Sequence, residues 1–194
     1  MATVVGICNR ALSYLKAQPI TSLTDGTESA RIVSRVYDYL RDELLRAHPW
    51  NFATKRAALA RLSTTPAWGY DYQFALPTDC LRVLAAVGSD ETEISDFKIE
   101  SRNLLTNEEA VYLLYVYRVT DPAQYDALFS AALSYRIISE IAYELTSSTA
   151  AAEASEKMFD RRISEARGVD AREGTPETVY RPTTWYAARF GGRS

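Results

Sequence analysis

The spacing of the apolar residues changes twice along this chain, and that change limits the folds that it can adopt. Residues 27–48 carry an apolar stripe of helical period, residues 68–75 alternate with a period of two, and the helical period returns over residues 122–147. A period near 3.6 indicates an amphipathic helix, and a period of two indicates a strand. Helices from the two ends of the chain must therefore pack together to bury their stripes, with the strands inserted between them.

This pattern predicts a mainly α fold with inserted β structure, of the α+β class. We expect an up-and-down bundle of about four helices that carries an antiparallel β insertion and an extended C-terminal tail. The predicted domains are a helical bundle made of residues 1–50 and 120–172, an inserted β segment at 51–119, and a C-terminal arm at 173–194.

The predicted helices have recognisable ends. They are expected at residues 3–17, about 27–48, 122–147 and about 150–170. The second should stop at His48, because Pro49 disfavours a helical conformation in the residue before it. Asp121 and Pro122 fit the start of the third helix, with the aspartate as cap and the proline at the first position. Apolar residues cover well over half of its circumference, so this helix should be central to the bundle.

The intervening segment is rich in strand-forming residues. Large aromatics occupy every second position of residues 68–75, which predicts one strand face that carries Trp68, Tyr70, Tyr72 and Phe74. A turn should follow at 76–79. Further strands are expected at 80–87, 97–100, 104–106 and 111–119, whereas 55–62 fits either a helix or a strand. Both faces of 111–119 are apolar, so one should cover the bundle and the other should meet another layer of the chain or another molecule.

The composition argues against several functional classes. The chain has 194 residues, of which 47% are hydrophobic, enough for one globular domain or one domain with an insertion. A net charge of -3 with mixed signs disfavours a sequence-independent nucleic-acid binder or a membrane-surface binder. We expect neither a membrane-spanning helix nor a signal peptide. Cys8 and Cys80 lie in apolar patterns without metal-ligand spacing, which predicts buried thiols in a protein that folds in a reducing cytoplasm.

The sequence offers little support for catalysis. His48 is the single histidine, and its position fits a favourable interaction with the negative end of a helix. None of the eight glycines belongs to a phosphate-binding loop. Close acidic pairs, Glu91 with Glu93 and Glu108 with Glu109, fit solvated loops better than a glycosidase site. We therefore expect no enzymatic activity, no catalytic or metal-binding residues and no cofactor.

The arm at 173–194 has an unusual composition. It follows neither period, yet it contains four large aromatic rings with arginines between them. Aromatic residues and arginine are enriched at the hot spots of protein interfaces. The predicted partner-binding residues are therefore Tyr180, Arg181, Trp185, Tyr186, Arg189 and Phe190. They would dock on another protein or, alternatively, along the chain's own bundle.

Two stretches of the sequence resemble a known family. Residues 49–57 read Pro-Trp-Asn-Phe-Ala-Thr-Lys-Arg-Ala, and residues 68–83 read Trp-Gly-Tyr-Asp-Tyr-Gln-Phe-Ala-Leu-Pro-Thr-Asp-Cys-Leu-Arg-Val. They resemble the tail tubular protein A family, the head-to-tail adaptors of T7-like and related tailed bacteriophages. The order of parts agrees over nearly the whole chain: a helix pair, this signature, a β segment, a long apolar helix and an alanine-rich helix.

The resemblance implies a structural virion protein of the phage neck, assembled in the host cytoplasm. It implies a homo-oligomeric ring of twelve subunits, bound to the portal protein on one side and to a tail nozzle or another tail protein on the other. DNA would pass through this ring without sequence-specific binding, and no membrane would be involved. In such families the C-terminal segment commonly reaches toward the portal, which agrees with the binding residues expected in the arm.

Three other classes remain open. A phage tail-associated cell-wall hydrolase would need a cleft in which a carboxylic acid of raised pKa lies near a second carboxylate. A head-completion or tail-terminator protein of a long-tailed phage would share the structural role. A bacterial regulatory helical domain is disfavoured by the net charge and by the lack of a basic recognition helix.

Overall fold

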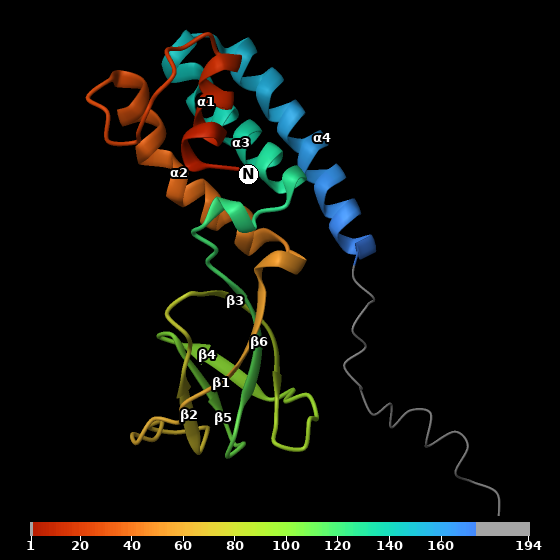
Figure 1. Ribbon diagram of the computed structural model, residues 1–194. Coiled ribbons are helices and arrows are strands. Elements are labelled where there is room, and N and C mark those ends of the chain that lie inside the picture. Colours follow the sequence, from red (N-terminus) through yellow and green to blue (C-terminus); the bar gives the residue numbers. More distant parts are fainter. Residues whose placement is uncertain (1, 174–194) are drawn as a thin grey trace, which may run out of the picture. The chain divides into compact units, whose positions relative to one another are not determined.

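The computed structural model describes residues 2–173 and confirms the α+β class (Figure 1). The helices are α1 (Val4–Tyr14), α2 (Glu28–Ala47), α3 (Ala127–Thr146) and α4 (Thr149–Glu173). The strands are β1 (Thr54–Ala58), β2 (Tyr72–Ala75), β3 (Cys80–Val87), β4 (Phe97–Glu100), β5 (Asn103–Thr106) and β6 (Tyr112–Tyr117). The chain forms two compact units: a helical unit from residues 1–54 and 116–174, and a β unit from residues 55–115. The predicted extended tail lies outside the described residues.

Side-chain caps explain where the first two helices begin. The Thr3 hydroxyl accepts a hydrogen bond from the Gly6 N–H at 3.0 Å, and the Thr27 hydroxyl accepts one from the Ala30 N–H at 3.2 Å. Each bond satisfies a backbone donor that the first helical turn leaves without a partner. As predicted, α2 ends before Pro49, and His48 is already extended with φ -142° and ψ 143°.

The predicted start of the third helix is wrong by five residues. Asp121 and Pro122 begin only a 3-10 helix, Pro122–Gln124, which ends where Tyr125 turns extended with ψ 140°. The α-helix starts at Ala127 instead, because the Asp126 carboxylate accepts hydrogen bonds from the N–H groups of Leu128 and Phe129. Two aspartates five residues apart can both act as caps, and only the second is followed by an uninterrupted helix.

Helix α3 is the centre of the helical unit, as its wide apolar surface predicts. It packs against α1, α2 and α4. Ion pairs from Arg35 to Glu144 at 2.6 Å and from Arg136 to Glu43 at 3.4 Å show that α2 and α3 run antiparallel. The apolar stripes seen at residues 27–48 and 122–147 supply the core between α2 and α3, although Val36 is half-buried. The buried residues of this core include Tyr125, Phe129, Leu133, Ile137, Ile141, Val33, Leu40 and Leu44.

An aromatic cluster lies where the chain leaves the helical unit after α2 and returns to it before α3. The centroids of the Trp50, Phe52 and Tyr125 rings each lie between 5.1 and 6.1 Å from another ring of the cluster, and Phe129 contacts all three at 5.1 Å. The Trp50 Nε1 donates to the Leu44 carbonyl oxygen at 2.9 Å, so burial of the indole leaves no polar atom without a partner. We call these four residues the Phe129 cluster.

The β unit contains two three-stranded antiparallel sheets, with strand orders β1-β6-β3 and β2-β5-β4. Single bridges link them at both edges, from Arg61 to Phe74 and from Val87 to Glu93. The strands predicted at 80–87, 97–100, 104–106 and 111–119 are confirmed to within two residues at each end, and the ambiguous segment forms β1. Both cysteines, Cys8 in α1 and Cys80 in β3, are buried as predicted.

The two faces of β6 differ in burial. Leu113 and Tyr115 are buried on one face, whereas on the other face Tyr112 is 48% exposed, Leu114 is half-buried and only Val116 is buried. The Tyr115 hydroxyl donates to the Asp79 carboxylate at 3.2 Å, which anchors the turn before β3. The second face therefore lacks a full cover within the described residues, and its predicted contact with another molecule stays a prediction.

Replacing Phe129 with alanine should lower the free energy of unfolding by about 3–5 kcal/mol, because this fully buried ring leaves a cavity among three others. Tyr143→Ala is the matched control on the same helix: its ring is 59% exposed, and its loss should change stability by less than about 0.5 kcal/mol. Urea unfolding measures both. A loss below about 1 kcal/mol for Phe129→Ala would show that α3 is not the core helix.

Candidate partner-binding surface

Among residues 2–173, the large apolar side chain with the greatest exposure is that of Trp68, at 83%. It lies in the loop that precedes β2. Leaving an indole in water forgoes the stabilisation of its burial, about 25 cal/mol for each Å² of apolar surface. Because tryptophan is also the residue type most enriched at interface hot spots, this loop is the first place to look for a binding site.

The loop explains why the predicted strand at 68–75 is wrong over its first half. Gly69 has φ +89°, a left-handed conformation that glycine adopts without strain and that interrupts an extended run. The Asp71 N–H donates to the Asn107 side-chain oxygen at 3.0 Å instead of to a neighbouring strand. The strand therefore begins at Tyr72, and the four aromatic rings do not share one face: Phe74 is buried, Tyr70 and Tyr72 are half-buried, and Trp68 is exposed.

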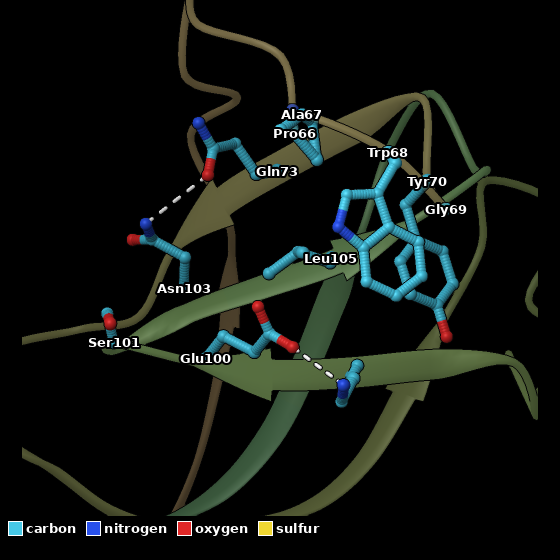
Figure 2. Close-up of a pocket in the computed structure, with 11 residues that line it drawn as sticks. Pro66, Ala67, Trp68, Gly69, Tyr70, Gln73, Glu100, Ser101, Asn103 and Leu105 are labelled. Carbon is cyan, nitrogen blue, oxygen red and sulfur yellow. Dashed lines mark hydrogen bonds and ion pairs between the residues drawn. The ribbon is translucent and has the colours of Figure 1, made fainter.

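The strand register explains what lies beneath the loop. Gln73 of β2 and Lys98 of β4 both pair with Leu105 of β5. Because side chains alternate along strands, these three share one face of the sheet with Asn103 and Glu100. Figure 2 shows this face, with Trp68 and Tyr70 from the loop and Gln73, Glu100 and Asn103 from the strands. The opposite face holds Phe74 and Leu104, which are buried in the core of the β unit.

A shallow hollow of about 270 Å³ lies between this loop and the sheet. Leu105 is its buried apolar floor. Gln73 and Asn103 are joined by a hydrogen bond of 3.4 Å on one side, and Lys98 and Glu100 by an ion pair of 2.7 Å on the other. The hollow continues past Tyr70 and Asn107 toward a second one that contains Asp96 and Glu108.

Tyr70 holds the loop to the sheet. Its hydroxyl donates to the Asp96 carboxylate at 3.0 Å. This hydrogen bond raises the pKa of Tyr70 above its ordinary value, because the neutral phenol is the form that donates. The side chain is therefore a neutral donor at physiological pH, and it fixes the loop beside Trp68. We call the surface formed by Pro66, Trp68, Tyr70, Asp96 and Glu100 the Trp68 surface.

The Trp68 surface is suited to binding a protein partner and offers few reactive side chains for catalysis. Lys98, which lines the adjacent hollow, is already paired with Glu100, and that pairing raises the pKa of the lysine. No group of three or more His, Cys, Asp and Glu side chains that could hold a metal occurs in the described part of the chain. An exposed ring flanked by carboxylates is instead suited to contacts with a protein partner.

His48 has a partner that the sequence did not reveal. It lies at the C-terminal end of α2, as predicted, and its Nε2 lies 3.0 Å from the Asp170 carboxylate of α4. The other carboxylate oxygen of Asp170 accepts from the Asn51 N–H at 3.0 Å, and the Asn51 amide donates to the Asp170 carbonyl oxygen at 2.7 Å. This network joins the end of α4 to the segment that follows α2. His48 therefore has a structural role in the helical unit.

The remaining sequence-predicted residues fall into two groups. Of the acidic pairs, Glu91, Glu108 and Glu109 are exposed, in keeping with solvated loops, and Glu93 is half-buried. The predicted partner-binding residues all lie outside the described residues: Tyr180, Arg181, Trp185, Tyr186, Arg189 and Phe190. The exposure of Trp68 was missed, although Pro66 and Gly69 on either side of it are residues typical of loops.

Comparisons with known proteins add no assignment, since neither a protein-family model nor a curated protein matches this sequence. Among residues 2–173, no helix is long and apolar enough to cross a membrane.

The two tryptophans of the signature should respond oppositely to truncation. Trp68→Ala should change the free energy of unfolding by less than about 0.5 kcal/mol, because the ring has few neighbours to lose. Trp50→Ala should cost about 3–5 kcal/mol, because its ring is fully buried in the Phe129 cluster. Chemical denaturation of both variants measures the difference. Comparable losses would mean that Trp68 belongs to the core of the β unit.

Proposed function

We propose that this protein is a head-to-tail adaptor of a tailed bacteriophage, a structural subunit of a ring that joins the portal to the tail and leaves a channel for DNA. The observation that carries the proposal is the exposure of Trp68 within a signature whose other large aromatics are buried or half-buried. Trp50 and Phe74 are buried, whereas Trp68 is 83% exposed. A large apolar residue that does not serve the fold is best explained by contact with another molecule.

The packing of the other signature residues supports the family resemblance. Trp50 belongs to the Phe129 cluster, where it contacts Phe52 and Phe129. Asp79 accepts from the Tyr115 hydroxyl and lies 3.3 Å from the Lys55 ammonium group, so it ties the turn at 76–79 to two strands. The Pro77 carbonyl oxygen accepts from the Cys80 N–H at 2.9 Å. These residues hold the fold together through packing and hydrogen bonds. A resemblance in such residues is therefore a resemblance of the whole fold.

The partners and location follow from the proposal rather than from the fold, since a fold by itself does not define a function. The ring would have twelve subunits, with the portal protein on one side and a tail nozzle or another tail protein on the other, in the neck of the virion. The arm residues Tyr180, Arg181, Trp185, Tyr186, Arg189 and Phe190 would contact the portal or a neighbouring subunit. A net charge of -3 gives the chain little overall attraction for phosphates, as suits a channel through which DNA slides.

The hydrolase alternative gains no support from the carboxylates with shifted pKa values. A glycosidase acid needs a raised pKa. Hydrogen bonds from the Thr21 and Ser22 N–H groups lower the pKa of Asp25, and those from the Thr92 hydroxyl and N–H lower the pKa of Asp90. Both shifts favour the charged form and are opposite to the one that a catalytic acid requires.

The proposal predicts that the full chain binds the portal rings of its own phage. Native mass spectrometry of the mixture should show the portal ring with twelve added subunits, since each portal subunit would offer one docking site. The portal of an unrelated phage is the control and should gain none.

Two outcomes would contradict the proposed function. One is a portal ring that gains no mass at concentrations of this protein well above those of the ring. The other is turnover of peptidoglycan that a single Asp or Glu substitution abolishes without unfolding the protein, because that result would identify an enzyme instead.

A further inference from the structure

The surroundings of the Trp68 surface are strongly acidic. Seven carboxylates and two cations occur between residues 88 and 109. Both cations are engaged: Lys98 pairs with Glu100 at 2.7 Å, and the Arg102 guanidinium donates to the Pro77 carbonyl oxygen at 2.6 Å. Glu93, Asp96 and Glu108 line the hollow that adjoins the surface. A partner that docks here meets negative charge beside an exposed indole.

An exposed indole beside carboxylates favours the binding of arginine-rich protein segments and disfavours the binding of nucleic acid. A guanidinium group can stack on the face of an indole and pair with a neighbouring carboxylate at the same time. Phosphates would be repelled by the same carboxylates. The hollow is shallow and lies along the sheet between a loop and three strands, so it suits an extended segment better than a compact small molecule.

The chain itself contains a segment of this chemistry. Residues 175–194 include three arginines, Arg181, Arg189 and Arg193, and one acidic residue, Glu177. They also include four large aromatic rings. The segment is therefore basic where the surface is acidic, and both have aromatic side chains to bury. At full extension its 20 residues could span about 70 Å, enough to reach a neighbouring molecule.

We propose that residues 175–194 of each subunit dock on the Trp68 surface of a second copy of this chain. This inference rests on the proposed ring, because a contact between two different surfaces of identical subunits is the kind that closes a ring. It assigns the arm one of the two partners left open above, the neighbouring subunit. Trp68 would supply the apolar anchor, and Asp96 and Glu108 would face the arginines.

Photo-crosslinking in the full chain tests this inference. A benzophenone amino acid replaces Trp185. Unlabelled and ¹⁵N-labelled chains are then mixed in dissociated form and reassembled. The mixture is irradiated at high concentration, alone and with portal rings, then digested for mass spectrometry. We expect adducts between position 185 and residues 63–73 or 93–108 that join one light and one heavy peptide.

Trp68→Ala, introduced into the same crosslinking chain, should reduce these adducts at least about fivefold, the change that corresponds to the loss of an anchor worth about 1 kcal/mol. Tyr143→Ala, which removes an exposed ring from the helical unit, is the matched control and should leave them unchanged.

Adducts that join only peptides of the same isotope would overturn the inference, because they mean that the arm docks on its own chain. Adducts confined to residues 2–54 or 116–173, or to the portal, would overturn it as well. Failure of the proposed function is a separate result: the portal would bind no subunits, whichever adducts form between copies of the chain.

Discussion

The packing of Trp50 against Phe129 is the contact on which the rest of the structure depends. Trp50 follows α2 directly, just before the chain enters the β unit, and Phe129 lies in the first turn of α3, shortly after the chain returns. Around this contact, the Tyr117 hydroxyl donates to the Phe52 carbonyl oxygen at 3.4 Å, and Arg118 pairs with Asp42 at 2.7 Å. Both ends of the insertion are thus fixed in the helical unit by the aromatic core that stabilises it. An inserted β unit whose two ends are held in this way can present loops without weakening the bundle.

The sequence was sufficient for the parts of the fold in which local signals agree. Helix α2 has a capping Thr27, an unbroken apolar stripe and a stopping Pro49, and it was predicted to within one residue at each end. Strand β3 was predicted with its bounds, because every residue from Cys80 to Val87 except Arg82 is apolar and a clear turn precedes them. Prediction failed where two local signals compete. Asp121 and Asp126 are both plausible caps, and the alternation of residues 68–75 outweighed the single glycine that breaks it.

The candidate site was harder to predict, because it is made by register and exposure rather than by a motif. The pairing of Gln73 and Lys98 with Leu105 brings together three strands whose polar residues are unremarkable in sequence. The His48–Asp170 contact joins residues 122 positions apart, which no spacing rule reveals. Trp68 could be recognised as a large aromatic in a loop-like setting, but its exposure depends on how Gly69 and Tyr70 direct the loop. Function by surface contact leaves a weaker trace in one sequence than catalysis would, since it needs no fixed set of reactive side chains.

If the Trp68 loop is an assembly surface, its amide hydrogen exchange rate should change when the protein assembles. The measurement compares the free chain with the chain assembled with its portal, and it follows the peptides that contain residues 63–71. These peptides should exchange more slowly in the assembled particle, because a docked partner restricts opening of the loop and access of water. The exposed end of α3 around Tyr143 should keep its rate and serves as an internal reference. Unchanged exchange at residues 63–71 in an otherwise assembled particle would contradict the account, because the loop would then remain open to solvent.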